Sequence, residues 1–214
     1  MLKIVRFVFN AFGENTYLAI DAATNQAAVI DPGMVSSAEK DALDKYIRQN
    51  DIKLTQIILT HAHIDHILGA GYVKDKYGAV IKAHPADGFI ARSANLQAQR
   101  FGMKNSIDPV DFDVELKDGD EIQIGESSLA VIHLPGHSPG GIVLYDRADN
   151  VAFTGDSIFE GSIGRTDLEG GDYHTLVKAL KDKVLTLPGD TVLLPGHGEP
   201  TDVKNEKATN PYLK

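Results

Sequence analysis

The sequence contains no cysteine among its 214 residues. This absence excludes a disulfide framework, a thiolate metal ligand and a thiol nucleophile. Basic residues are also scarce relative to acidic ones, 21 against 30, which gives a formal net charge of −9 and a pI near 5.3. An acidic surface argues against a nucleic-acid partner, because nucleic-acid binding usually needs a basic footprint.

Long apolar segments are missing as well. No apolar run reaches the length of about 18 residues that a membrane span requires. The apolar start, residues 1–12, is interrupted by Lys3 and Arg6 and is not typical of a secretory signal. With 43% hydrophobic and 24% charged residues, the composition is that of an ordinary globular protein. We therefore expect one domain over residues 1–214, located in the cytoplasm.

Apolar patterning divides the chain into strands and helices. A capping-box pattern at residues 36–39 predicts a helix that ends near Asn50, and residues 172–185 have the pattern of an amphipathic helix. Another helix is expected from about Asp65 to Tyr77. Strands are predicted at residues 5–9, 16–20, 27–30, 57–60, 79–83, 114–116, 121–124, 129–134, 142–145, 151–154 and 191–194.

Residues 85–112 are the least regular part of the sequence. Pro85 can begin a helix that runs to about Phe101, after which Gly102, Asn105 and Pro109 break the pattern. The residues alone assign no role to this segment.

The densest group of polar side chains follows the apolar run at residues 57–60. His61, His63, Asp65 and His66 come directly after this expected strand. On an extended segment, His61 and His63 point the same way. Burying four polar groups without partners would be costly, whereas imidazole and carboxylate are donors that Zn²⁺ prefers. The group therefore predicts a metal site; the alternative is a polar loop that happens to be rich in histidine.

Three other histidines are expected to lie outside any site. A lone histidine is more often a structural residue, and this is our interpretation of His84 and His133. His174 falls in the first turn of an amphipathic helix, so we expect it at the surface.

Four ordered motifs resemble those of the metallo-β-lactamase superfamily. They are His-x-His-x-Asp-His at residues 61–66, Pro-Gly-His-Ser-Pro-Gly at 135–140, Phe-Thr-Gly-Asp-Ser at 153–157 and Pro-Gly-His-Gly at 195–198. Together they cover most of the chain. The resemblance implies an α+β fold, the four-layer αββα sandwich of that superfamily, with two mixed sheets face to face, helices outside and metals at one edge.

Carried over residue by residue, the resemblance implies two divalent metal ions, expected to be Zn²⁺, with Fe or Mn as alternatives. The implied ligands are His61, His63 and His137 for the first ion, Asp65, His66 and His197 for the second, and Asp156 as a bridge. An open position on the first ion is typical of a catalytic site. A hydroxide shared by the ions would attack a carbonyl. Asp65 would orient it, so Asp65 and Asp156 are the expected catalytic residues.

The resemblance to the superfamily also extends to two short segments, residues 31–33 and 164–167. In Asp31-Pro32-Gly33, Asp31 is either a turn residue or a carboxylate that orients a ligating imidazole. In Gly164-Arg165-Thr166-Asp167, Arg165 is expected to anchor its loop through charge-assisted hydrogen bonds, with substrate contact as the alternative.

Within the superfamily, the motifs are most similar to those of glyoxalase II-like thioesterases, the hydroxyacylglutathione hydrolases. The chain ends soon after His197 and resembles the compact form without a C-terminal helical domain. This implies hydrolysis of a hydroxyacyl thioester such as S-lactoylglutathione. A thiolate leaves readily, since thiols have a pKa of about 8.5. The thiol carrier stays open, because in longer members the additional domain supplies the basic residues for glutathione.

Two other classes of function remain beside the thioesterase, a persulfide dioxygenase and a non-catalytic binding module. A mononuclear iron persulfide dioxygenase would use His61, His137 and Asp156 as a set of two histidines and one carboxylate. All seven ligand positions are filled, which favours the hydrolase and argues against a non-catalytic binding module. Lactonase activity is a neighbouring possibility, and β-lactamase activity is less in keeping with the Asp65–His66 pair.

The expected partner is a small-molecule thioester, with no nucleic acid and no membrane. The sequence assigns no substrate-binding residue and no oligomeric state.

Overall fold

Two mixed β-sheets stacked face to face form the centre of the protein, and helices cover both outer faces. The computed structural model describes residues 1–103 and 107–214. This arrangement of two sheets between helices confirms the predicted αββα fold class.

The first sheet joins six strands in chain order from edge to edge. They are β1 (Leu2–Phe9), β2 (Glu14–Asp21), β3 (Gln26–Ile30), β4 (Lys53–Ile58), β5 (Val80–Ala83) and β6 (Val114–Glu115). The first three strands are antiparallel, whereas β3, β4, β5 and β6 are parallel. The carboxyl ends of these four strands consequently meet at one edge of the sheet.

The second sheet has the order β14-β13-β10-β9-β8-β7. Its strands are β7 (Glu121–Ile124), β8 (Ser127–His133), β9 (Ile142–Asp146), β10 (Val151–Gly155), β13 (Val192–Pro195) and β14 (Thr201–Asp202). The β10–β13 pair is parallel, whereas β9 and β10 form an antiparallel hairpin. A small hairpin, β11 (Ile158–Phe159) with β12 (Ser162–Ile163), follows β10.

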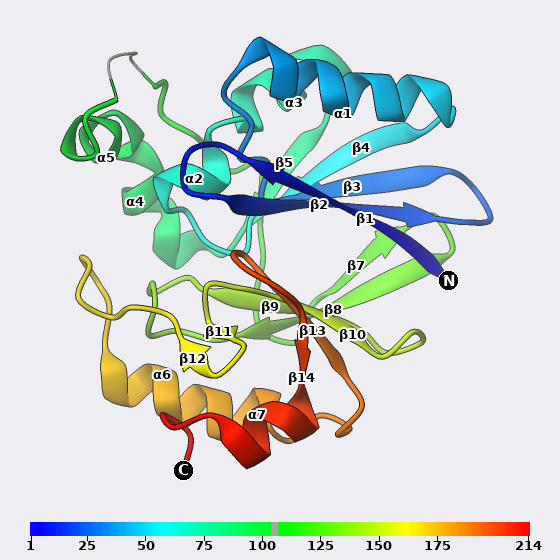
Figure 1. The fold of residues 1–214 in the computed structure, drawn as a ribbon. Coiled ribbons are helices and arrows are strands. Elements are labelled where there is room, and N and C mark those ends of the chain that lie inside the picture. The colour runs from blue at the N-terminus through cyan, green and yellow to red at the C-terminus, as the bar shows by residue number, and fades with distance from the viewer. Residues whose placement is uncertain (104–106) are drawn as a thin grey trace.

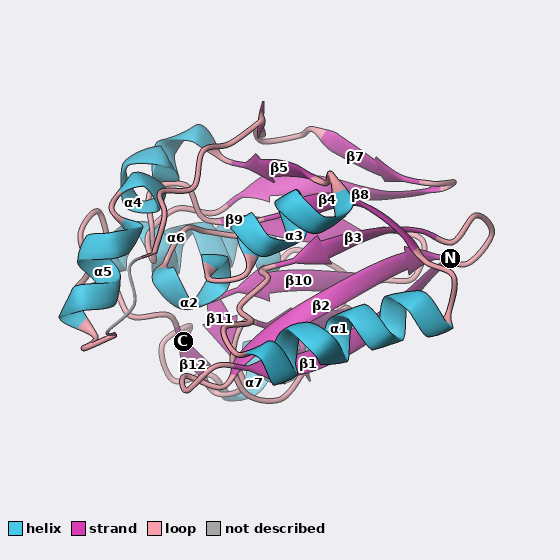
Figure 2. Ribbon diagram, turned by 90° about the horizontal axis from the view of Figure 1, so that it is seen from above, coloured by secondary structure: helices cyan, strands magenta, loops and turns pink. Residues whose placement is uncertain are grey.

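Helices cover the two outer faces and one edge (Figure 1). The first sheet carries α1 (Ser37–Gln49) and α3 (Ala70–Tyr77), and Figure 2 shows both lying across its strands. The second carries α6 (Tyr173–Ala179), continued as the π-helix η2 (Leu180–Val184), and α7 (Val203–Thr209). The edge carries α2 (Ile64–Ile67), the 3₁₀ turn η1 (Pro85–Asp87), α4 (Gly88–Arg92) and α5 (Ala94–Arg100).

The apolar core has three layers because successive strand residues face opposite sides of a sheet. In β4, Ile57 packs toward the helices while Ile58 lies between the sheets. In β10, Phe153 lies between the sheets while Ala152 packs with the helices below. These near-continuous apolar runs are typical of strands buried on both faces.

The predicted capping box of α1 is confirmed. The Ser36 hydroxyl accepts a hydrogen bond from the Glu39 backbone, and the Glu39 carboxylate accepts one from the Ser36 backbone. Leu43 and Ile47 of this helix are buried in the core.

The single helix predicted from Pro85 to Phe101 is wrong: the segment forms η1, α4 and α5. The break lies at Ser93, whose hydroxyl donates to the carbonyl of Ile90 and so competes with regular helical bonding. Asn105 lies outside the described residues.

One further prediction needs correction. The helix after Asp65 is split into α2 and α3 at Gly69, where a Cβ atom would lie 1.9 Å from the Met34 sulfur. The strands expected at residues 114–116 and 121–124 are present as β6 and β7, and the Asp118–Gly119 turn between them carries the chain from the first sheet to the second.

Across residues 1–103 and 107–214, the helices are too short or too polar to cross a membrane.

Candidate metal centre

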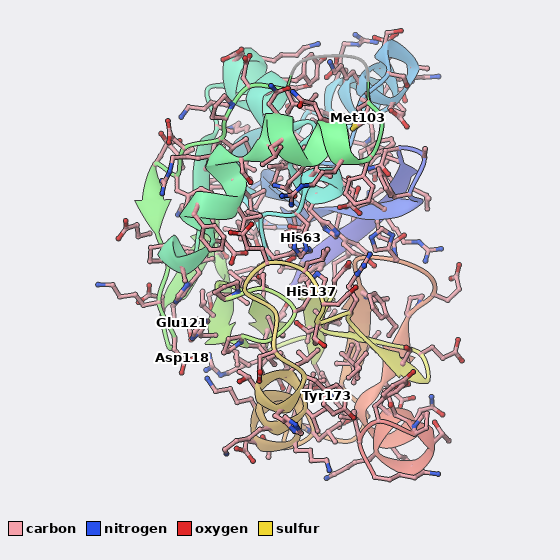
Figure 3. All side chains as sticks on the ribbon, turned by 90° about the vertical axis from the view of Figure 1, so that its left-hand side faces the viewer. His63, Met103, Asp118, Glu121, His137 and Tyr173 are labelled. Atoms are coloured by element: carbon pink, nitrogen blue, oxygen red, sulfur yellow. The ribbon has the colours of Figure 1, made fainter. Side chains whose placement is uncertain are left out.

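Polar side chains from both sheets meet at the edge where the parallel strands end. The seven predicted ligands follow or cap these strand ends: His61 and His63 after β4, Asp65 and His66 on α2, His137 after β8, Asp156 after β10 and His197 after β13. Figure 3 shows His63 and His137 lying close together at the boundary between the two halves of the molecule. The structure thus brings all seven residues into one cluster.

Three imidazoles form the first group within this cluster. His61, His63 and His137 each offer a ring nitrogen, and these three atoms lie within 4.8 Å of one another. The Nδ1 atom of His63 lies 2.8 Å from Nε2 of His137. We call these residues the three-histidine group.

Asp65, His66 and His197 form the second group. Their ligand atoms also lie within 4.8 Å of one another. Nε2 of His197 lies 3.1 Å from Oδ2 of Asp65, and Nε2 of His66 lies 3.6 Å from the same oxygen. We call these residues the Asp65 group.

The carboxylate of Asp156 lies between the two groups. Its Oδ1 is 3.4 Å from Nε2 of His66, and its Oδ2 is 3.8 Å from Nε2 of His137. The close approach depends on Gly196, because a Cβ atom there would lie 2.3 Å from Asp156 Oδ1. Asp156 is thus the carboxylate that faces histidines of both groups.

Hydrogen bonds at the outer ring nitrogens orient four of the imidazoles. Nδ1 of His137 donates to the carbonyl of Arg165 at 2.7 Å, and Nδ1 of His197 donates to the carbonyl of Phe12 at 3.2 Å. Because a carbonyl only accepts, both rings carry a proton on Nδ1 and turn Nε2 toward the cluster.

Asp31 and Thr60 orient the other two rings in the same way. Nδ1 of His66 donates to Oδ2 of Asp31 at 3.1 Å. Thr60 donates its hydroxyl to the same oxygen, so its Oγ1 is left to accept from Nδ1 of His61 at 3.1 Å. Both Nε2 atoms again face inward. Of the two roles open for Asp31, the structure shows the orienting one.

The histidine pKa values of the two groups shift in opposite directions, because only the Asp65 group has carboxylates that outweigh burial. Burial, followed by the neighbouring imidazoles, lowers the pKa of His61 well below its usual value and that of His63 to about 3. Burial also lowers the pKa of His66, but the carboxylates of Asp156 and Asp65 outweigh it and raise that pKa well above normal. His61 and His63 therefore favour the neutral form with a free lone pair, whereas His66 favours the positively charged form.

Unpartnered atoms at the centre of the cluster test whether a cation fits. Nε2 of His61, Nε2 of His66 and Oδ1 of Asp156 are buried and have no hydrogen-bond partner within the described part of the chain. Buried polar atoms normally have partners, and imidazole with carboxylate is a donor set for divalent cations. The residues fit a metal centre.

The remaining histidines lie where their sequence context predicted. His174 is exposed on α6. His84 and His133 stack on each other with ring centroids 4.0 Å apart, and Nε2 of His133 donates to the carbonyl of Pro139. These contacts confirm a structural role for the pair.

Arg165 forms an ion pair within its own loop, in keeping with the loop-anchoring role expected for it, and it also lines the cavity described below, so substrate contact stays open as the alternative. Its guanidinium forms two hydrogen bonds of 2.7 Å with the Asp167 carboxylate. Its carbonyl holds His137, so the anchored loop also positions a residue of the three-histidine group.

A cavity of about 450 Å³ opens beside the cluster. Its apolar wall contains Phe12, Phe89, Ile90, Phe101 and Leu168, and its polar wall contains Ser93, Gln97, Arg100, Arg165 and Glu169. His63, Asp65, His137, Asp156 and His197 line its inner end. Much of this wall, from Phe89 to Phe101, comes from the irregular segment after Pro85, in which the sequence assigned no substrate-binding residue.

Comparison with known proteins agrees with this geometry. The family model described as the metallo-β-lactamase superfamily matches residues 10–197. Hydroxyacylglutathione hydrolase GloC from Haemophilus influenzae is 39% identical over 210 residues, covering 95% of this chain and 94% of that protein. The mitochondrial persulfide dioxygenase ETHE1 of Homo sapiens is 31% identical, covering 92% of this chain and 70% of that protein.

Two solved structures have closely similar folds. The B3 metallo-β-lactamase BLEG-1 superposes with a TM-score of 0.90 and 30% identity, covering 99% of this chain and 100% of that one. A protein solved in a di-iron-bound form superposes with a TM-score of 0.86 and 34% identity, covering 98% of this chain and 100% of that one.

Proposed function

The chain belongs to the metallo-β-lactamase superfamily, and from that premise we propose that it is a dinuclear metal-dependent thioester hydrolase. The observation that carries the proposal is that Nε2 of His61, Nε2 of His66 and Oδ1 of Asp156 lie buried in the cluster without a hydrogen-bond partner among the described residues. Its substrate would be a small-molecule hydroxyacyl thioester such as S-lactoylglutathione, in line with the name of the relative from Haemophilus influenzae.

Each group of ligands would hold one ion. The three-histidine group offers three uncharged donors, and the Asp65 group offers two imidazoles and a carboxylate. Asp156 would contact both ions, since its two oxygens face histidines of both groups. When bound, two divalent ions activate a water molecule as the nucleophile and polarise the carbonyl that it attacks. We propose Zn²⁺, with Fe or Mn as alternatives.

The protein residues would position the reactants. Asp65 lies at the inner end of the cavity. Burial opposes its ionised form, but His66 and His197 outweigh burial and lower the pKa of Asp65. An ionised carboxylate there accepts a hydrogen bond from a water molecule and so fixes the direction of attack. Asp65 and Asp156 are therefore the proposed catalytic carboxylates.

The cavity favours a thioester over an amide. Within the described residues, its lining contains no lysine or tyrosine that could protonate an amine leaving group. A thiol has a pKa of about 8.5 and departs as a thiolate without such an acid. This distinction favours thioester hydrolysis over β-lactam hydrolysis.

Arg100 would recognise the charged part of the substrate. It lines the cavity from α5, and within the described residues no carboxylate forms an ion pair with it. A guanidinium in this position suits a carboxylate of the thiol carrier, and the neighbouring phenylalanine rings suit its apolar part.

A persulfide dioxygenase is the second candidate. The identity of 31% to the human enzyme favours it, and His61, His137 and Asp156 would then hold a single iron. Both enzymes would use the same cavity, so the number and identity of the metal ions separate them.

Metal analysis of protein purified without chelator is the first test. About two ions per chain, together with turnover of S-lactoylglutathione, would support the dinuclear hydrolase. A single iron with oxygen consumption on a persulfide would favour the dioxygenase. A chain that takes up no metal on reconstitution would overturn both proposals.

A further inference from the structure

Asp87 joins the two loops that carry the three-histidine group. It lies in η1, after β5 of the first sheet, and its side chain is only 1% exposed. Its Oδ2 accepts hydrogen bonds from the Ala62 backbone at 3.0 Å and from the Ser138 hydroxyl at 2.8 Å. Its Oδ1 accepts from the backbone of Gly140. One buried carboxylate thus bonds both loops at once.

These bonds fall on the immediate neighbours of the histidines. Ala62 lies between His61 and His63, and Ser138 directly follows His137. The first loop leaves the first sheet and the second leaves the second sheet. The hydrogen bonds of Asp87 therefore connect the loop of His63 to the loop of His137, whose ring nitrogens lie 2.8 Å apart.

The chemistry of the bridge requires a carboxylate. All three partners are donors, and they approach both oxygens of Asp87. An ionised carboxylate accepts at both oxygens, whereas an amide of the same shape presents a donor on one side. Gly140 also approaches closely, since a Cβ atom there would lie 2.7 Å from Asp87 Oδ1.

The Asp65 group is held by different residues. Asp31 orients His66, and the side chain of Asn10 donates to the backbone carbonyl of Asp65 at 3.0 Å. Asp87 has no hydrogen bond to this group within the described residues. A change at Asp87 should therefore act on one half of the centre.

We propose that Asp87 is a positioning residue that sets the spacing of His61, His63 and His137 and thereby the metal affinity of the three-histidine group. It lies in the chain directly before α4, whose Phe89 and Ile90 line the cavity. The bridge therefore also fixes the cavity wall relative to the metal centre. This inference rests on the proposed dinuclear function.

The test is Zn²⁺ titration of the metal-free protein against a chromophoric chelator, for the wild type and Asp87→Asn. Substitution of a residue that holds metal ligands in place typically lowers metal affinity by about 10- to 100-fold. We expect Asp87→Asn to weaken one of two Zn²⁺ sites by about this factor and to leave the other unchanged. Ser138→Ala, which removes one donor from the same carboxylate, should weaken the same site by a smaller factor.

Asp146→Asn is the matched control. Asp146 is also a buried carboxylate, 2% exposed, and it accepts from the backbones of Ala148 and Asp149 at the far end of β9. The control should lower the melting temperature of the metal-free protein and leave both Zn²⁺ affinities unchanged. This control separates the effect of a general loss of stability from the effect of a change in the distances between the histidines.

The outcomes separate the two proposals. If the wild type binds two Zn²⁺ ions and Asp87→Asn binds both with the same affinities, Asp87 is not a positioning residue. The same conclusion follows if Asp87→Asn and Asp146→Asn weaken Zn²⁺ binding equally. If the wild type itself binds no Zn²⁺, the proposed function fails before the variant is compared.

Discussion

Oδ2 of Asp31 lies 3.1 Å from Nδ1 of His66 and fixes the ring so that Nε2 faces the metal centre. Asp31 itself has a positive φ of 50°, which asparagine tolerates. In Asp31→Asn, an amide group replaces the oxygen that accepts from both His66 and Thr60. We expect Zn²⁺ affinity at the Asp65 group to fall by about 10- to 100-fold, measured by chelator competition. Asp51→Asn, at an exposed turn with φ of 51°, should leave that affinity unchanged; equal losses in both variants would contradict the role.

Removal of the carboxylate shared by both groups should affect both ions. Asp156→Ala deletes the oxygens that face His66 and His137. We expect metal content below two ions per chain and loss of thioesterase activity, measured by elemental analysis and a thioester assay. Two bound ions with full turnover in this variant would refute the bridging role.

The histidines outside the cluster serve as controls for metal binding. His174→Ala removes an exposed side chain and should change neither metal content nor melting temperature. His84→Ala removes a ring stacked on His133, so we expect a lower melting temperature with unchanged metal content. A drop in bound metal in either variant would assign that residue to the site.

Arg100 should distinguish substrates by charge. Loss of one exposed charge contact costs about 1 kcal/mol, so Arg100→Ala should raise the KM for S-lactoylglutathione about fivefold with kcat little changed. The KM for an uncharged thioester should stay as it is. Arg92→Ala, on neighbouring α4 and outside the cavity lining, is the control. If KM rises equally for both substrates, Arg100 does not bind the charged group.

Asp21 should make stability depend on acidic pH. Its carboxylate accepts from Thr24 in the β2–β3 turn and from Ser127 at the start of β8. The Thr24 hydroxyl, against opposing burial, lowers the pKa of Asp21 to about 2. The unfolded value is about 3.9, so the stabilisation is complete above about pH 4 and is lost as the pH falls toward about 2.

Asp21→Asn removes this dependence. Its melting temperature should lie below that of the wild type at neutral pH, and the difference should shrink between about pH 4 and pH 2. A constant difference over this range would show that Asp21 does not contribute through its charge.

The metal-site motifs could be recognised in the sequence because only a few residue types bind divalent metal ions. Imidazoles and carboxylates at strand ends have few structural uses, so His61 and His63 after an apolar run already indicated a metal site. The αββα layering came from the family resemblance, and the apolar runs of β4 and β10 agree with it, since both strands are buried on two faces.

Other features depend on contacts between residues far apart in the chain. Asp87 meets Ser138 across 51 positions, and no local pattern records such a pairing. At the break between α4 and α5, the Ser93 hydroxyl donates to the carbonyl of Ile90, a bond that helix periodicity does not reveal. Arg100 lies on α5, after that break, so its place in the cavity wall could not be derived from the sequence.

The distribution of the ligands between the two sheets has a consequence for folding. His61, His63, Asp65 and His66 belong to the first half of the chain, whereas His137, Asp156 and His197 belong to the second. Neither half alone holds a complete set of the proposed ligands, so a bound ion would cross-link the two sheets at their common edge. Because a ligand that binds only the folded state stabilises it by mass action, metal occupancy would hold the sandwich closed, and the two sheets would unfold as one cooperative unit.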